Sequence, residues 1–272
     1  MEKALVLITL TTDFGLQDPY VGQLKGALFK GYSAITVVDL THAIPAWDVA
    51  AAARVIRSSY HYFPDGTIHL IVVDPGVGGQ RALLVAAGDG HFFVAPDNGV
   101  LSMLVADNRI DTIHRVERPD FFRSSVSATF HGRDIMAPVA AVLAASTNLE
   151  QFGPAVEPGS IRTILVPESV RKDGCVSGQV QRIDHFGNIQ TSIQAGDVVF
   201  EPSAFDFLQI GDHRISQFVR TYQDAAPGSL LVLINSSGHV EIAANQASAA
   251  ERIGCIQGDP VTLHLLEAEL PT

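Results

Sequence analysis

Three groups of polar and glycine residues each follow a short apolar run in the first half of the chain. They are Thr11–Gly15 (TTDFG), Asp74–Gly79 (DPGVGG) and Ala95–Gly99 (APDNG). Such apolar runs predict the strands of an α/β sheet, and ligands of open α/β sheets bind beyond the carboxyl ends of the strands. We therefore expect the chemistry of this chain where these groups meet.

Asp13 and Asp18 bracket a turn that precedes a predicted helix. One interpretation is structural, because a carboxylate at a helix start accepts hydrogen bonds from unpaired backbone N–H groups. The other is binding, because a carboxylate at a strand end can accept hydrogen bonds from both hydroxyls of a diol such as ribose. Asp13 suits the second role, and Asp18 remains open to both.

Asp74 opens a glycine-rich loop, which could be only a flexible turn. The loop is not a G-x-G-x-x-G dinucleotide fingerprint, and it is not a P-loop, since no Gly-Lys-Ser/Thr follows. Its glycines would nevertheless let the backbone approach a ligand closely. Arg81 stands just before the next apolar run, where its guanidinium is predicted to pair with Asp74.

His131 lies in the segment Thr129–Asp134, just before a helix predicted from Ile135. Asp134 is predicted to be the N-cap of that helix rather than a catalytic group. A lone histidine is usually a satisfied surface or core residue, but this one stands in a glycine-flanked loop beside a helix start. His131 is therefore a functional candidate.

Two polar turns punctuate the second half of the chain, His185–Asn188 and Asn235–Gly238. Simple hairpin chemistry explains both turns. Phe186 is unusual, because an aromatic side chain in a polar turn, next to the amide of Asn188, could stack on a nucleobase and read its edge.

Residues 1–150 alternate β-rich apolar runs with amphipathic helical stretches, which predicts an α/β domain with a mainly parallel sheet. The predicted strands are Leu5–Leu10, Ile35–Leu40, Ile68–Val73, Ala82–Ala86 and Phe92–Ala95. The predicted helices are one that buries Val21, Leu24 and Leu28, a second over Val49–Tyr62 and a third over Ile135–Ala145.

Residues 151–172 are predicted to be a linker, because proline and glycine recur there without periodicity. Beyond it the helical pattern does not return. Residues 173–272 predict a smaller, barrel-like all-β domain. Its expected strands are Val176–Ile183, Leu230–Ile234, Val240–Ala243 and Val261–Leu266.

Composition excludes several classes of protein. The formal net charge of -11 argues against a nucleic-acid partner, because such proteins gather Lys and Arg into a positive surface. The apolar run at 4–10 is too short to span a membrane, so we expect a cytoplasmic protein without a membrane partner. The histidines are not spaced as metal ligands usually are, so we expect no metal site. Cys175 and Cys255 are expected to be buried structural thiols.

The ordered motifs resemble those of the S-adenosylmethionine (SAM) hydroxide adenosyltransferases, relatives of the fluorinase and chlorinase that make 5'-halogenated adenosines. The resemblance covers nearly the whole chain. It rests on TTDFG at 11–15, DPYVGQLKG at 18–26, WDV at 47–49, VDPGVGG at 73–79 with Arg81, APDNG at 95–99, TFHGRDIMAP at 129–138, DHFGN at 184–188 and NSSGHVEIA at 235–243.

The resemblance implies a hydrolase that splits SAM into adenosine and L-methionine, with SAM as substrate and no further cofactor. It also implies a homotrimer with sites between neighbouring subunits. The matching positions imply catalytic roles for Asp74, Arg81 and His131. They also imply that Asp13 holds the ribose, that Asp18 and Ser236 hold the methionine end, that Trp47 lines the pocket, and that Phe186, Asn188 and Tyr222 surround the adenine.

Two differences from the halogenases favour water over halide. The halogenases have Tyr at the position of Asp74, and the fluorinase has Ser at the position of Gly132. The fluorinase also carries a long insertion after the strand that begins here at Arg81, whereas this chain has the short turn Gly88–Gly90. The fluorinase's basic residues near the methionine end are Ser237 and Ala244 here, so no cationic clamp is expected. The alternatives are a halide-using adenosyl transferase and a non-catalytic adenosine- or SAM-binding protein.

The resembling triad also suggests a mechanism. Pairing with Arg81 predicts a depressed pKa for Asp74, whereas His131 titrates nearer neutrality and is on that ground the better proton acceptor. The sequence does not decide which residue takes the proton.

Overall fold

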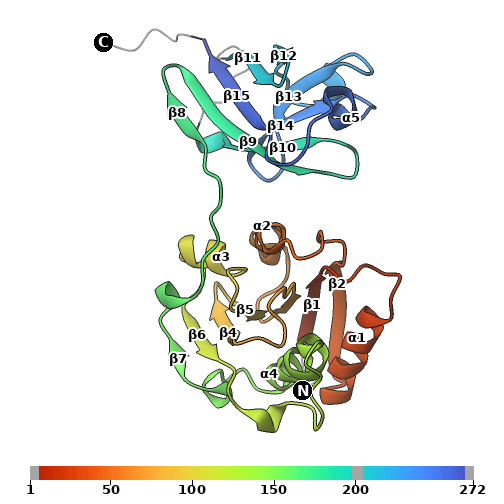
Figure 1. Cartoon of the computed structure of the whole chain (residues 1–272), viewed down its shortest axis with the longest axis vertical. Coiled ribbons are helices and arrows are strands. Elements are labelled where there is room, and N and C mark those ends of the chain that lie inside the picture. Colours follow the sequence, from red (N-terminus) through yellow and green to blue (C-terminus); the bar gives the residue numbers. More distant parts are fainter. Residues whose placement is uncertain (1–5, 198–204, 267–272) are drawn as a thin grey trace. The chain divides into compact units, whose positions relative to one another are not determined.

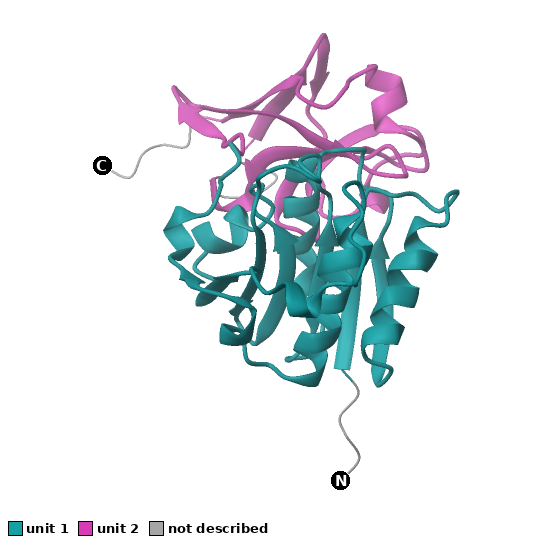
Figure 2. Ribbon diagram, turned by 60° about the horizontal axis from the view of Figure 1, so that its bottom comes forward, with its two compact units in different colours: residues 1–165 teal, residues 166–272 magenta. Residues whose placement is uncertain are grey.

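The computed structural model describes residues 6–197 and 205–266 of the chain. The chain divides into two compact units, Met1–Leu165 and Val166–Thr272 (Figure 2). The division falls inside the range predicted to be a linker, 151–172. Each unit has its own sheet and its own hydrophobic core. Leu5, predicted as the first residue of a strand, lies outside the described residues.

The first unit is built on a seven-stranded sheet with the order β2-β1-β3-β5-β4-β6-β7 (Figure 1). The predicted strands are all present, and β6 and β7 were not predicted. The strands are β1 (Val6–Thr12), β2 (Ile35–Thr41), β3 (Ile68–Val72), β4 (Leu83–Gly88), β5 (His91–Pro96), β6 (Thr112–Arg115) and β7 (Ala155–Val156).

The prediction of a mainly parallel sheet is wrong, because the sheet is mixed. Strands β2, β1, β3 and β5 pair in parallel, whereas β5, β4, β6 and β7 pair antiparallel. The reversal begins at Asp89 and Gly90, both of which have positive φ, 51° and 81°. Two such residues form the tight turn that joins neighbouring strands into a hairpin, so β4 and β5 cannot be linked by a helical crossover.

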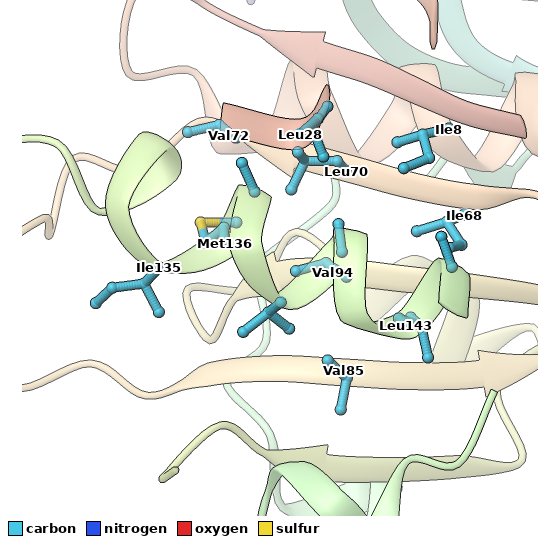
Figure 3. Close-up of a cluster of buried hydrophobic side chains, with 14 of the residues drawn as sticks. Ile8, Leu28, Ile68, Leu70, Val72, Val85, Val94, Ile135, Met136 and Leu143 are labelled. Atoms are coloured by element: carbon cyan, nitrogen blue, oxygen red, sulfur yellow. The ribbon is translucent and has the colours of Figure 1, made fainter. Parts of the chain in front are cut away.

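Two helices, α1 (Tyr20–Gly31) and α4 (Ala137–Ala145), pack together over one face of this sheet. Figure 3 shows Met136, in the turn just before α4, and Leu143, in α4, together with sheet residues of the same core such as Leu70 and Val94. The first unit also contains the α-helices α2 (Val49–Ser59), with a 3₁₀ turn (Tyr60–Tyr62) after it, and α3 (Ser102–Ala106). The three predicted helices are therefore confirmed.

Two histidines are buried on the face of the sheet opposite α1 and α4. Ile8 and Leu10 belong to the core under these helices, so Thr9 between them faces the other way. The Thr9 hydroxyl lies 2.8 Å from Nδ1 of His69, and His69 Nε2 lies 3.2 Å from Nδ1 of His91. His69 is fully buried, and this burial, with the nearby His91, lowers the pKa of His69 to about 3. His69 is thus neutral in the folded protein at physiological pH.

We expect the stability of the first unit to fall in mild acid because of His69. The pKa of His69 is lower in the folded chain than its unfolded value of 6.5, so its contribution is complete above pH 6.5 and declines as the pH falls toward 3. The loss between pH 6.5 and 4.5 should be about 2–3 kcal/mol. Urea unfolding of the wild type and of His69→Asn across this range measures it. Equal pH slopes in the two proteins would refute the assignment.

The second unit is a nearly closed antiparallel sheet with the strand order β12-β11-β15-β9-β10-β14-β13, and β8 pairs with β9. The end strands β12 and β13 contact one another, which is the near-barrel that the sequence predicts. The four expected strands are present. The strands are β8 (Val170–Lys172), β9 (Cys175–Ile183), β10 (Ile189–Gln194), β11 (Phe205–Ile210), β12 (His213–Ile215), β13 (Leu230–Ile234), β14 (His239–Ala244) and β15 (Pro260–Leu265), and the α-helix α5 (Ala249–Ile253) follows β14.

Both cysteines are unpaired thiols. Cys255 is buried as expected, but Cys175 is only half-buried. No helix in the described part of the chain is both long and apolar enough to cross a membrane.

Candidate active site

The three polar groups predicted at strand ends lie side by side, because β1, β3 and β5 are consecutive parallel neighbours in the sheet. Asp13 follows β1, Asp74 follows β3 by two residues, and Asn98 follows β5. The Asn98 side chain donates a 2.9 Å hydrogen bond to the carbonyl of Val73, which ties the third group to the second. The carboxyl edge of the parallel half of the sheet therefore carries the candidate site.

The predicted charged pair between Asp74 and Arg81 is present. Arg81 Nε lies 3.0 and 3.1 Å from the two carboxylate oxygens of Asp74, and its Nη2 donates to Oδ2. Both side chains are only 5% exposed. A two-pronged pair of this kind fixes both the distance and the plane of the carboxylate. Arg81 thus holds Asp74 in a fixed position at the site. The opposite charges of the two side chains cancel, so the pair has no net charge.

His131 joins this pair from a segment 50 residues further along the chain. Arg81 Nη2 lies 3.0 Å from Nδ1 of His131. A guanidinium can only donate, so Nδ1 must be the acceptor, and the proton of the neutral imidazole must be on Nε2. Burial and then the charge of Arg81 lower the pKa of His131 below its usual value, which keeps the ring neutral at pH 7. The ring can therefore offer an N–H donor to a ligand.

Glycine contacts bring these segments together. At Gly132, a β-carbon would lie 2.6 Å from Cγ1 of Val72, so the backbone beside His131 packs directly on the end of β3. At Gly78, with φ of 78°, a β-carbon would lie 2.3 Å from the carbonyl oxygen of Ala128. Only glycine allows either approach, and both place the His131 segment against the strand and loop that carry Asp74.

Replacing Gly78 with alanine is expected to destabilise the first unit by about 3 kcal/mol or more. The strain of an alanine in a left-handed backbone conformation adds to the clash of its β-carbon with the carbonyl of Ala128. Gly66→Ala is the matched control. Gly66 has a similar φ of 84°, but nothing lies within 4 Å of its added β-carbon. The control should cost about 1 kcal/mol. Denaturant unfolding measures both, and equal losses would show that the Ala128 contact is unimportant.

The prediction that Asp134 caps a helix is wrong. The helix begins earlier, as a π-helical turn over Gly132–Met136 that continues into α4, and Asp134 lies inside that turn. Its side chain is fully buried and accepts hydrogen bonds from the guanidinium groups of Arg123 and Arg133 and from the backbone N–H of Ser127. These bonds, those with Arg133 first, lower the pKa of Asp134 to about 2.

Asp13 and Trp47 are joined directly. Oδ2 of Asp13 accepts a 2.9 Å hydrogen bond from the backbone N–H of Trp47, which has a left-handed φ of 66°. The Trp47 side chain is 73% exposed. Asp18 is also exposed and does not cap α1, whose N-cap is Pro19 with no capping side chain. Both oxygens of Asp13 still have acceptor capacity for a ligand.

The remaining predicted residues lie in the second unit. Phe186 is 74% exposed at the tip of a turn in which Oδ1 of Asp184 accepts from the backbone N–H groups of Phe186 and Asn188. The Asn188 amide donates to Oδ2 of Asp184, at 3.1 Å. Ser236 is exposed in the turn between β13 and β14. The turn at 184–188 thus presents an aromatic ring to solvent, next to an amide that Asp184 holds in place.

Glu241 is a functional candidate that the sequence interpretation missed. It is 6% exposed, and it accepts a 2.8 Å hydrogen bond from the Tyr222 hydroxyl and a 3.0 Å bond from the Asn235 amide. Burial and then the bond to Glu241 raise the pKa of Tyr222. The available signal was a single carboxylate within the apolar strand His239–Ala244. Glu241 links Tyr222 to the turn that holds Ser236.

Comparison of the sequence with models of known protein families identifies the family of this chain. The model of the SAM hydroxide adenosyltransferase N-terminal domain matches residues 8–153, and that of the C-terminal domain matches residues 178–262. The chain belongs to the SAM hydroxide adenosyltransferase family. Among the residues that the structure describes, no group of three or more His, Cys, Asp or Glu side chains is placed to hold a metal ion.

Individual relatives agree with this membership. The chain is 40% identical to an (R)-S-adenosyl-L-methionine hydrolase of Salinispora tropica over 93% of this chain and 95% of that protein. It is 29% identical to a fluorinase of Actinopolyspora mzabensis over 90% of this chain and 92% of the relative. A crystal structure of an uncharacterized conserved protein from Thermotoga maritima has a TM-score of 0.88 and 32% identity, covering 94% of this chain and 99% of that one.

Proposed function

We propose that this chain hydrolyses S-adenosylmethionine to adenosine and L-methionine. The observation that carries the proposal is the group formed by the buried Asp74–Arg81 pair and His131 at the carboxyl edge of the sheet. Curated relatives from two Salinispora species and from Thermus thermophilus, 35–40% identical, are named (R)-S-adenosyl-L-methionine hydrolases and support it. The proposed reaction needs no cofactor besides its substrate, and we place it in the cytoplasm.

The proposed step is an in-line attack of a water oxygen on C5' of the ribose. The new C5'–O bond forms as the C5'–S bond breaks, and the bonding electrons leave with sulfur as the neutral thioether of methionine. A sulfonium is already a good leaving group, so the protein has no need to protonate it. Its main task is to hold the water in line, and positioning of this kind can supply several kcal/mol of the barrier reduction.

The geometry suggests how the three side chains share the work. Nδ1 of His131 is occupied by Arg81, so the Nε2–H group is proposed to donate to the attacking oxygen and orient it. This differs from the expectation that His131 is the better proton acceptor. We propose that Asp74, whose Oδ1 accepts only one bond from Arg81 and keeps a free acceptor site, takes the proton released by the water and passes it to solvent.

The other residues are proposed to bind the substrate. Asp13 would hold the two ribose hydroxyls, with Trp47 beside it, and Asp18 and Ser236 would hold the methionine end. The exposed Phe186 ring would stack on adenine, with Asn188 and Tyr222 around it. The exposure of Trp47 and Phe186 supports this proposal, because large exposed aromatic side chains often mark binding surfaces.

We further propose a homotrimer in which neighbouring subunits complete each site. We propose that the protein acts without a nucleic-acid or membrane partner. Mixing Asp74→Ala protein with a Phe186→Ala, Asn188→Ala double variant, after reversible dissociation, tests the arrangement. Partial recovery of activity is expected, because some interfaces would pair two intact halves. Proven subunit exchange without recovery would place the whole site within one chain.

Product analysis tests the activity itself. The purified protein is incubated with each sulfonium epimer of S-adenosylmethionine, with and without chloride or fluoride, and the products are separated by chromatography. Adenosine and methionine in halide-free buffer are expected. A 5'-halogenated adenosine that forms only with halide would show a halide-using transferase, and bound but unchanged ligand would show a binding protein.

A further inference from the structure

Among the described carboxylates of the first unit, Asp134 accepts the most hydrogen bonds, and the mechanism proposed above does not use it. Its Oδ1 accepts from Arg123 Nη1 at 2.9 Å and Arg133 Nε at 2.8 Å. Its Oδ2 accepts from Arg133 Nη2 at 2.8 Å and from Ser127 N at 2.9 Å. A carboxylate has about four lone-pair sites, and all of them are used. Asp134 therefore cannot accept a proton from, or bind, a reacting molecule.

The four bonds close a loop of the backbone. The carbonyl of Asp134 also accepts from the backbone N–H of Arg123, at 3.0 Å, so residue 123 is held twice by residue 134. Between these ends, the segment 123–134 carries Ala128, whose carbonyl meets Gly78, and His131, whose ring meets Arg81. The segment thus touches the loop that follows Asp74 through Ala128 and touches Arg81 through His131, while a single carboxylate holds its ends and its middle.

The arginine next to Asp134 extends this support to α1. Arg133 donates to the side-chain oxygen of Gln23 at 2.9 Å, and its guanidinium lies 4.8 Å from the ring centre of Phe130. Phe130 in turn packs edge-to-face with Phe14 and Tyr20. Phe14 directly follows Asp13. Through these contacts, the ion-pair cluster around Asp134 reaches two further segments: the loop that follows Asp74 and the segment that carries Asp13.

We propose that Asp134 is a positioning residue that sets the placement of His131 against Arg81. This inference rests on the proposed function for its kinetic consequence, but the placement itself does not depend on turnover. Asp134 acts through the loop that it closes and not through contact with the substrate. Neutralising it would leave two guanidinium groups without their partner and would release the loop that holds His131.

Asp134→Asn is the direct test. We expect kcat to fall about 100-fold with KM changed less than about threefold, because a misplacement near 1 Å can cost that much. In a His131→Ala background the same change should lower kcat less than about threefold, since the residue whose position it sets is gone. An equal loss in both backgrounds would overturn the proposal, because a merely structural role would lower activity in either one.

Arg123→Gln covers the case in which Asp134→Asn does not fold. Arg123 is 46% exposed, and its loss leaves the Arg133 bonds intact. It should lower kcat about three- to tenfold and show the same dependence on His131. Arg118→Gln is the matched control, because Arg118 pairs with the exposed Asp120 at the surface. The control should leave kcat unchanged.

Nitrogen-15 NMR of the His131 ring separates this proposal from the proposed function. In the wild type, Nδ1 should show the chemical shift of an unprotonated nitrogen and Nε2 that of a protonated one. In Asp134→Asn or Arg123→Gln the two shifts should move toward each other, because Nδ1 loses its fixed donor. Unchanged ring shifts would refute the positioning role whether or not the protein hydrolyses S-adenosylmethionine.

Discussion

Asp74→Ala and His131→Ala should each lower kcat by about two to four orders of magnitude, the usual scale for positioned acid–base groups, with little change in ligand affinity. Removing Asp74 takes away the proposed proton acceptor and leaves the Arg81 guanidinium unpaired. Removing His131 takes away the donor that Arg81 holds in one tautomer. Single-turnover rates, with calorimetric binding of adenosine, separate the two quantities.

The double variant Asp74→Ala, His131→Ala should be little worse than either single variant, because both residues are proposed to act on one water. Additive losses would indicate separate tasks. His213→Ala serves as a control, since His213 lies on β12 in the other unit. Weakened binding with normal turnover at saturation would reverse the role assignment.

Asp13→Asn should weaken adenosine binding by about 10- to 100-fold, the scale of a lost charged hydrogen bond. The carboxylate already accepts from the Trp47 N–H through Oδ2. If the single amide oxygen of Asn keeps that bond, an NH₂ group faces the ribose hydroxyls in place of an acceptor. The measurement is calorimetric titration with adenosine and with 2'-deoxyadenosine.

The 2'-deoxy ligand should lose much less affinity than adenosine on this substitution. Equal discrimination by wild type and variant would mean that Asp13 does not hold the ribose. Asp18→Asn is the matched control, because Asp18 is assigned to the methionine end. Its effect should appear with S-adenosylmethionine and be absent with adenosine.

Local patterns predicted the elements that carry the site. Strands β1, β3 and β5 were recognisable as apolar runs bounded by polar turns, and the Asp74–Arg81 pair spans only seven residues. The mixed sheet was not recognised, although Asp89 and Gly90 are a typical hairpin dipeptide. Alternation of strands with helices is typical of a parallel sheet, whereas a two-residue turn of this kind forces the strands it joins to run antiparallel.

Contacts between distant segments could not be read from local patterns. His131 meets Arg81 because Gly132 packs on Val72 and Gly78 packs on Ala128, and neither approach has a sequence period. Asp134 has the sequence pattern of an N-cap, but Arg123, 11 residues away, and a π-helical start change its role. Tertiary ion pairs of this kind override capping preference.

Hydrolysis in water enriched with oxygen-18 tests most directly that water attacks C5'. The products formed from S-adenosylmethionine are separated, and their masses are measured by mass spectrometry. The account predicts one oxygen-18 atom in the 5'-hydroxyl of adenosine and none in methionine, with almost no labelled adenosine formed by Asp74→Ala over the same time. Unlabelled adenosine, or label in methionine, would contradict it.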